Sequence, residues 1–291
     1  MTALVVVSAL FATAFVAIKV SVQVFSPVTV AALRLWLGAA VVGAFVGLAR
    51  RPPAAADSAP RPLAGGRRRA WVWVVLVGFL GYALPFSLVA YAETRIEAAT
   101  AGLLMASGPL AALLLAPLLT KDERLGPQRA LGALLGLAGV ALALGPLAHG
   151  TKDVLGGLCV VAAAVCYALA GFTARRIPWP TDRLTAGALI AAALLLSPVA
   201  LFTGPLVLAP PEPRHLWAIV YLGLLPTAVS YVLRFRLIVR HGYTFVSYAG
   251  YLVPVLSLLA GRLVLGEALS ANAILALVFI LTGIWVGHRR R

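Results

Sequence analysis

The sequence is dominated by long apolar stretches that carry no charged side chain. Windows of 18 or more such residues recur along the whole chain, and the first charged side chain is that of Lys19. Each window can cross a hydrocarbon core of about 30 Å as an α-helix, which rises about 1.5 Å per residue. Charged residues make up only 11% of the chain, whereas soluble domains carry about 25%. The chain is therefore predicted to be a polytopic membrane protein.

The apolar stretches are continuous, whereas the strands of a membrane barrel alternate apolar and polar residues. An all-α fold with ten transmembrane helices follows, and the only long connection is the Pro- and Arg-rich loop of about residues 49–70. The polar breaks place the ten spans at about 3–24, 28–49, 70–91, 98–119, 128–147, 154–174, 184–205, 216–236, 243–263 and 269–287.

The distribution of positive charge predicts the orientation, because cytoplasmic loops retain Lys and Arg. With the N-terminus inside, 18 of the 24 Lys and Arg residues fall on the inner side and 4 on the outer side. Both termini are therefore predicted to be cytoplasmic. The net charge of +15 is explained by this topology and by anionic lipid, and no nucleic-acid motif accompanies it.

One unusual pattern occurs twice. The stretch "GLLMASGPLAALLLAPLLTKDERLG" (102–126) resembles "GYLVPVLSLLAGRLVLGEALS" (250–270) in having an internal proline and a terminal acid. Pro109 and Pro254 are 145 residues apart, and Glu123 and Glu267 are 144 apart. Since each half holds five spans, an odd number, the halves must face opposite ways. Two inverted five-helix repeats, 1–150 and 151–291, are predicted around a central cavity.

The stretches "SPVTVAALR", "ASGPLAALLLAPLLTKDERLGPQRALGALLGLAGVAL" and "YLVPVLSLLAGRLVLGEALSANAILALVFILTGIWV" occur in an order that resembles the EamA-type branch of the drug/metabolite transporter superfamily. The resemblance covers essentially the whole chain. It implies ten helices with inverted pseudo-symmetry, small-solute export and a place in the bacterial cytoplasmic (inner) membrane. Amino-acid, drug and metabolite exporters occur in this group.

The predicted function is therefore secondary export of small amphipathic metabolites by alternating access, with neutral or aromatic amino acids favoured. A multidrug exporter of lipophilic cations is the alternative. An intramembrane enzyme is disfavoured, because the spans lack a nucleophile with a base or a metal-ligand cluster. No cofactor or metal is predicted. The expected partners are a small-molecule substrate and the lipid bilayer, and the protein is expected to be a monomer or a weak homodimer.

Two basic and two acidic residues stand out. Lys19 and Arg34 lie within spans, where a cation costs roughly 2.5–3.5 kcal/mol. Lys19 either attracts a substrate carboxylate or extends to the interface, and Arg34 is assigned a structural or gating role. Glu123 and Glu267 either cap the next helix or couple transport to protons.

Kinks at in-span prolines, among them Pro109 and Pro254, give helices a place to bend.

Aromatic and polar residues at mid-span are the candidates for solute contact, because such a pocket needs apolar walls with a few polar groups. Phe79, Tyr82 and Phe86 share one face by spacing. The alternative is that these tyrosines belong to the interfacial belt. The predicted substrate-binding residues are Lys19, Phe79, Tyr82, Met105, Tyr167, Ser230, Tyr231, Tyr248 and Tyr251.

Overall fold

The computed structural model describes residues 2–48, 66–119, 126–145, 151–177, 179–241 and 249–288. Within these ranges the ordered elements are helices, and the only pairing of extended backbone is an isolated bridge between Phe25 and Val207. Eight helices are long and apolar enough to cross a membrane, and two shorter apolar helices follow at Ala249–Leu265 and Ala271–Gly287. The prediction of an all-α protein with about ten spans is confirmed.

Residues 1–150 contain five spans, two of which are subdivided. Helix α3 begins at Gly66, so the predicted 49–70 loop is wrong at its C-terminal end, and residues 49–65 lie outside the described residues. The elements are α1 (Thr2–Ser21), α2 (Pro27–Leu48), α3 (Gly66–Gly78), η1 (Phe79–Ala83), α4 (Leu84–Ala92), α5 (Ala98–Leu104), α6 (Ser107–Leu119) and α7 (Pro127–Leu144).

The rest of the chain contains five further spans. The ninth, predicted at 243–263, is described from Ala249 onward. The elements are α8 (Thr151–Ala174), α9 (Thr181–Phe202), α10 (Pro213–Leu222), η3 (Gly223–Val229), α11 (Ser230–His241), α13 (Ala249–Ala260), η4 (Gly261–Leu265) and α14 (Ala271–His288).

Prolines account for the irregular segments of three spans. Proline has no N–H, so the carbonyl four residues earlier loses its helical partner. The wider π-helical segment η1 contains Gly81, four residues before Pro85, and η3 contains Pro226 itself. The fourth span is interrupted between α5 and α6 at Met105, four residues before Pro109. Pro117, Pro198 and Pro254 instead lie inside uninterrupted α-helices.

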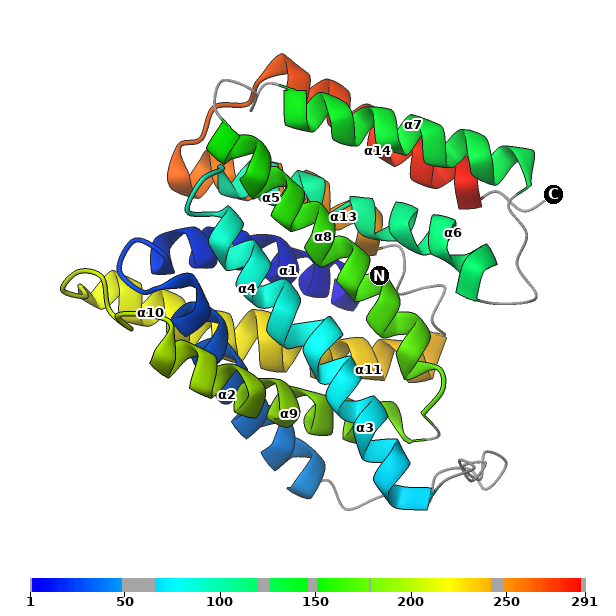
Figure 1. Ribbon diagram of the computed structural model, residues 1–291. Helices are drawn as coiled ribbons and strands as arrows, with labels where there is room; N and C mark the ends of the chain where they lie inside the picture. The colour runs from blue at the N-terminus through cyan, green and yellow to red at the C-terminus, as the bar shows by residue number, and fades with distance from the viewer. Residues whose placement is uncertain are drawn as a thin grey trace.

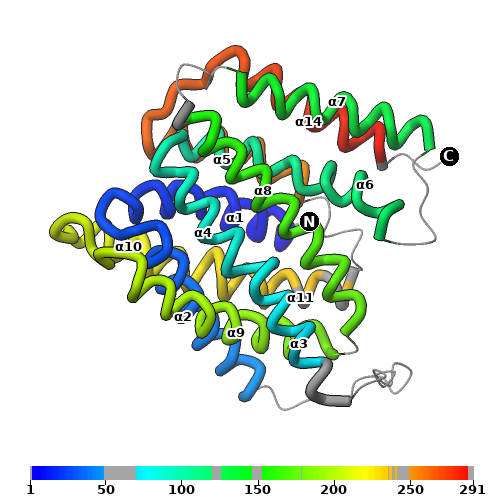
Figure 2. The backbone as a smooth tube through the Cα atoms, viewed as in Figure 1, coloured from blue at the N-terminus to red at the C-terminus, as the bar shows by residue number. Residues whose placement is uncertain are grey.

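The helices form one bundle in which segments distant in sequence lie together. Helix α1 packs on α13, α2 on α9, α4 on α8, and α7 on α14. The pair α7 and α14 occupies one edge of the bundle, at the top of Figure 1. Helix α1 begins and α14 ends at the same end of the bundle (Figure 2). The turns that follow α1, α4 and α9, at residues 22–26, 93–97 and 203–212, lie at the opposite end.

Glycines bring α7 and α14 into backbone contact. A Cβ on Gly132 would lie 2.5 Å from the Gly287 nitrogen, and one on Gly283 would lie 2.5 Å from the Gly136 nitrogen. Real Cβ atoms essentially never approach so closely, so glycine is required at these positions. These glycines therefore serve packing between helices of the same chain. The same helices expose Leu134 and Trp285 on their outer faces, as expected for a lipid contact.

Candidate solute site

Arg34 is a buried cation at the contact between α2 and the η3 segment. Only 6% of the residue is exposed. Its Nε donates a hydrogen bond of 2.7 Å to the Thr227 hydroxyl oxygen, and its guanidinium carbon lies 3.7 Å from the centre of the Phe86 ring. The described residues provide Arg34 with no ion-pair partner. The guanidinium is therefore held by one hydroxyl and one aromatic face. Glu93 lies within electrostatic reach of it but forms no hydrogen bond with it.

The proline in η3 explains why Thr227 can hold Arg34. The carbonyl of Leu222 would accept from residue 226 in an α-helix, but Pro226 has no N–H. The Thr227 hydroxyl donates to that carbonyl instead, at 2.8 Å. Close approach of α2 depends on Gly38, where a Cβ would lie 2.5 Å from the Thr227 methyl carbon. A proline and a glycine thus position the oxygen that accepts from Arg34.

Aromatic side chains from three spans surround this region. The ring centres of Tyr82 and Phe86 are 5.9 Å apart, those of Tyr82 and Tyr231 are 5.4 Å apart, and those of Phe11 and Tyr231 are 6.0 Å apart. We call Phe11, Tyr82, Phe86 and Tyr231 the central aromatic cluster. Tyr167 packs against the same buried core. Edge-to-face and tilted contacts of this kind favour ordered ring positions.

The other predicted residues lie in different places. Met105 and Tyr251 pack against a second buried core, which contains Phe15. Ser230 is fully buried and donates to the Leu225 carbonyl at 3.1 Å. Phe79 is 42% exposed and does not join Tyr82 and Phe86, because the π-helical turn alters the spacing from which a shared face was predicted. Tyr248 and Glu123 lie outside the described residues.

Lys19 joins the end of α1 to the turn between α4 and α5. Its ammonium donates to the backbone carbonyl oxygens of Glu93 at 2.8 Å and Ile96 at 2.7 Å. These carbonyls follow α4, where a cation is favoured by the helix dipole. Contact between Lys19 and a solute stays a prediction.

Glu267 holds the beginning of α5 by its side chain. Its two carboxylate oxygens accept from the backbone nitrogens of Ala98 and Ala99, each at 2.8 Å. A Cβ on Gly261 would collide with this carboxylate, so glycine makes room for it. The expectation that Glu267 caps the next helix is wrong: it caps a helix from the other half of the chain. Ser270 accepts from Ala273 at the start of α14 instead.

Glu93 is a functional candidate that the sequence did not reveal. It is 0% exposed, and neither carboxylate oxygen has a hydrogen-bond partner in the described part of the chain. The sequence places it in "YAETRIEAA", directly after an apolar span, where an acid is normally a solvated turn residue. Thr227 was also missed, because a single hydroxyl in an apolar span has no distinctive signal.

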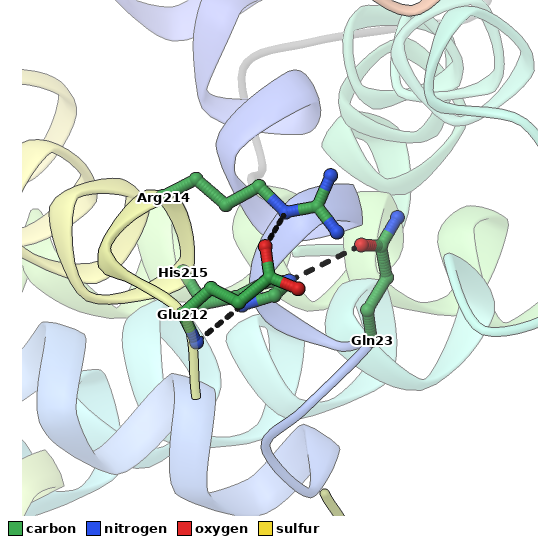
Figure 3. A network of polar contacts seen from close by, with 4 residues as sticks. All are labelled: Gln23, Glu212, Arg214 and His215. Carbon is green, nitrogen blue, oxygen red and sulfur yellow. Dashed lines mark hydrogen bonds and ion pairs between the residues drawn. The ribbon is translucent and has the colours of Figure 1, made fainter. Parts of the chain in front are cut away.

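A polar network near Glu93's end of the bundle connects the turn after α1 with the start of α10 (Figure 3). The backbone N–H of Glu212 donates to Nδ1 of the buried His215 at 3.1 Å, and the other ring nitrogen lies 3.4 Å from Oε1 of Gln23. Glu212 also forms an ion pair of 2.9 Å with Arg214. Nearby, Leu208 donates to the Val24 carbonyl. Gln23 follows Lys19 by about one helical turn, so both side chains hold the same end of α1.

Comparison with known proteins agrees with this architecture. The sequence pattern of the EamA-like transporter family matches residues 1–145 and 154–287. An uncharacterized protein, PA1977 of Pseudomonas aeruginosa, is 33% identical over 88% of this chain and 82% of its own length. The uncharacterized transporter YdfC of Bacillus subtilis is 26% identical over 94% of this chain and 86% of its own length.

An uncharacterized transporter of Archaeoglobus fulgidus is 23% identical over 96% of this chain and 94% of its own length. A solved crystal structure with 27% identity superimposes with a TM-score of 0.66, covering 99% of this chain and 96% of the other. The fold and these relatives define a multi-pass membrane transporter. The chain belongs to the EamA-like transporter family.

Proposed function

We propose that the protein exports small amphipathic metabolites that carry a carboxylate, with neutral or aromatic amino acids as the main substrates. The observation that carries the proposal is Arg34, a buried cation with no ion-pair partner among the described residues, which lies against Phe86. We thus give Arg34 a role in solute contact in addition to the structural or gating role predicted from the sequence. A solute carboxylate would offer its guanidinium charge-assisted hydrogen bonds. The central aromatic cluster would contact an apolar solute side chain.

The same observation argues against the alternative of a lipophilic-cation exporter. Aromatic rings can bind cations through their faces, but the Phe86 face is already occupied by the Arg34 guanidinium at 3.7 Å. A second positive charge beside Arg34 would be repelled in a site of low dielectric constant. Amino acids therefore fit the local charge better than cationic drugs do.

We propose that transport proceeds by alternating access between inverted repeats, residues 1–150 and 151–291. Three observations support this division. The π-helical segments η1 and η3 begin at Phe79 and Gly223, a separation close to that between Pro109 and Pro254. The packing of α1 on α13 has a counterpart in the packing of α8 on α6. The two segments matched by the family pattern also divide near residue 150.

Counterflow in proteoliposomes would test this function. Vesicles loaded with unlabelled L-phenylalanine should accumulate labelled L-phenylalanine from outside, and vesicles loaded with tetraphenylphosphonium should not accumulate labelled tetraphenylphosphonium. Arg34→Gln should abolish the phenylalanine signal, because it removes the proposed carboxylate contact. Arg214→Gln is the matched control, since that arginine is 65% exposed and lies outside the aromatic cluster. The proposal is wrong if Arg34→Gln exchanges phenylalanine with an unchanged KM.

Lys19 is the second basic residue proposed to meet the solute carboxylate. Two of its three N–H donors are used on backbone carbonyls, which leaves one for a ligand. Lys19→Gln should then raise the KM for phenylalanine uptake into inverted vesicles. A lower maximal rate with an unchanged KM and normal expression would assign Lys19 to the α4–α5 turn alone.

A further inference from the structure

Glu93 occupies an environment in which a charged carboxylate would be unstable. It lies in the turn after α4 with 0% exposure, and both carboxylate oxygens lack a partner among the described residues. Burying an ionised carboxylate without hydrogen bonds is far more costly than burying the neutral acid. The nearest ammonium, that of Lys19, donates to two backbone carbonyls and not to this carboxylate.

The charged groups around Glu93 come from three other segments. Lys19 of α1 and Arg34 of α2 favour the charged form, whereas Glu267 before α14 disfavours it. Burial outweighs the two cations and raises the pKa of Glu93 well above its ordinary value. On the same turn, Arg95 lies over the Tyr91 ring and donates to Thr94, and Glu97 is only partly buried.

Glu93 also lies where several spans are closed together. Lys19 ties α1 to the turn, and the Glu267 carboxylate ties the α14 side to the start of α5. On α8, a Cβ at Gly156 would lie 3.1 Å from the Ile96 side chain, so α8 packs tightly on the same turn. In this packed arrangement the Glu93 carboxyl is closed off from solvent.

We propose that Glu93 is a proton-binding site that must be occupied for this end of the bundle to close. Opening would hydrate the carboxylic acid, which then releases H⁺ to water and becomes a carboxylate. Closing would reverse the step: the carboxylate takes one H⁺ from the water on that side and becomes the neutral acid. The proposal rests on the transport function proposed above, because alternating access requires this end to open and close.

The first experiment measures the protonation state without a substrate. Infrared spectra of the purified protein at about neutral pH should contain the band of a protonated carboxyl group. Glu93→Gln should remove that band. The matched control Glu97→Gln should keep it, since that side chain lies one turn away and is more exposed. Absence of the band in the unaltered protein, or its persistence in Glu93→Gln, would overturn the proposal.

The second experiment measures opening directly. A cysteine replacing the buried Ile96, in a chain lacking Cys159 and Cys166, reports access of a membrane-impermeant maleimide. Its labelling rate, divided by that of an exposed cysteine at Pro211, should rise with pH. With Glu93→Gln the ratio should stay low and independent of pH, whereas Glu97→Gln should retain the rise. A pH-dependent ratio in Glu93→Gln contradicts the proposal.

The two proposals can fail separately. If phenylalanine counterflow is absent, the proposed substrate is wrong, but the infrared and labelling results still decide the role of Glu93. If counterflow is present, its rate should depend on pH in the unaltered protein and not in Glu93→Gln. A pH-dependent rate in that variant would count against Glu93 and leave the transport function intact.

Discussion

A single buried acid sets the expected pH dependence of stability. The pKa of Glu93 in the folded protein is raised, mainly by burial, above the ordinary value of 4.5. The folded state therefore binds this proton more tightly than the unfolded state. The stabilisation that this bound proton gives the folded state is fully present below about pH 4.5, and it is lost as the pH rises through the folded-state pKa of Glu93.

Glu93→Gln should remove this decline, because glutamine cannot ionise. Thermal unfolding of the unaltered protein in detergent should show a falling Tm from about pH 5 to about pH 8, and Glu93→Gln should show a smaller fall. Glu97→Gln is again the control. Parallel Tm profiles for the unaltered protein and Glu93→Gln would show that the carboxyl is not held neutral.

At the same scale, His215 is expected to stabilise the start of α10. The residue is 3% exposed, and its ring nitrogen accepts from the Glu212 backbone. His215→Ala should lower the free energy of unfolding by about 1 kcal/mol, because it removes a helix cap and leaves the Glu212 N–H without its side-chain acceptor. Chemical denaturation in detergent measures the change, and an unaltered midpoint and slope would contradict it.

Among the helices, the contact between η4 and α5 also depends on a glycine. Gly261→Ala should displace the Glu267 carboxylate from the Ala98 and Ala99 N–H groups. The expected loss is about 1–2 kcal/mol, the usual range for a helix cap. Gly43→Ala is the matched control, because a Cβ there meets nothing within 4 Å and alanine favours helix. Equal Tm values for the two variants would refute this role of Gly261.

The elements also show why sequence reasoning succeeded for the fold and less well for the site. Span positions follow from runs of apolar residues, which depend only on local composition. The contacts of Glu267 with Ala98, or of Arg34 with Thr227, join residues far apart in the chain and depend on helix packing. The separation of Phe79 from Tyr82 depends on a π-helical turn, which regular helical spacing does not predict. Glu93 is buried by packing that has no local signal.

For the whole molecule, the charge distribution predicts which end faces the cytoplasm. Thr181 is exposed at the beginning of α9, and Pro211 is exposed in the turn that follows the other end of α9. In a chain lacking Cys159 and Cys166, cysteine at Thr181 should label only from the cytoplasmic side and cysteine at Pro211 only from outside. Labelling of both from one side of intact cells would contradict the proposed topology.

The contact between α7 and α14 has a consequence for biosynthesis. Gly132 and Gly139 of α7 pack against the backbone of α14, and residues 145–270 lie between the two helices. At about 5–20 residues per second, the ribosome needs on the order of 6–25 s to make that stretch. During this interval α7 is already in the membrane with its glycines facing lipid or the insertion machinery. The fifth span thus remains without its main partner until the last span arrives, so the N-terminal half cannot complete its packing before translation is nearly finished.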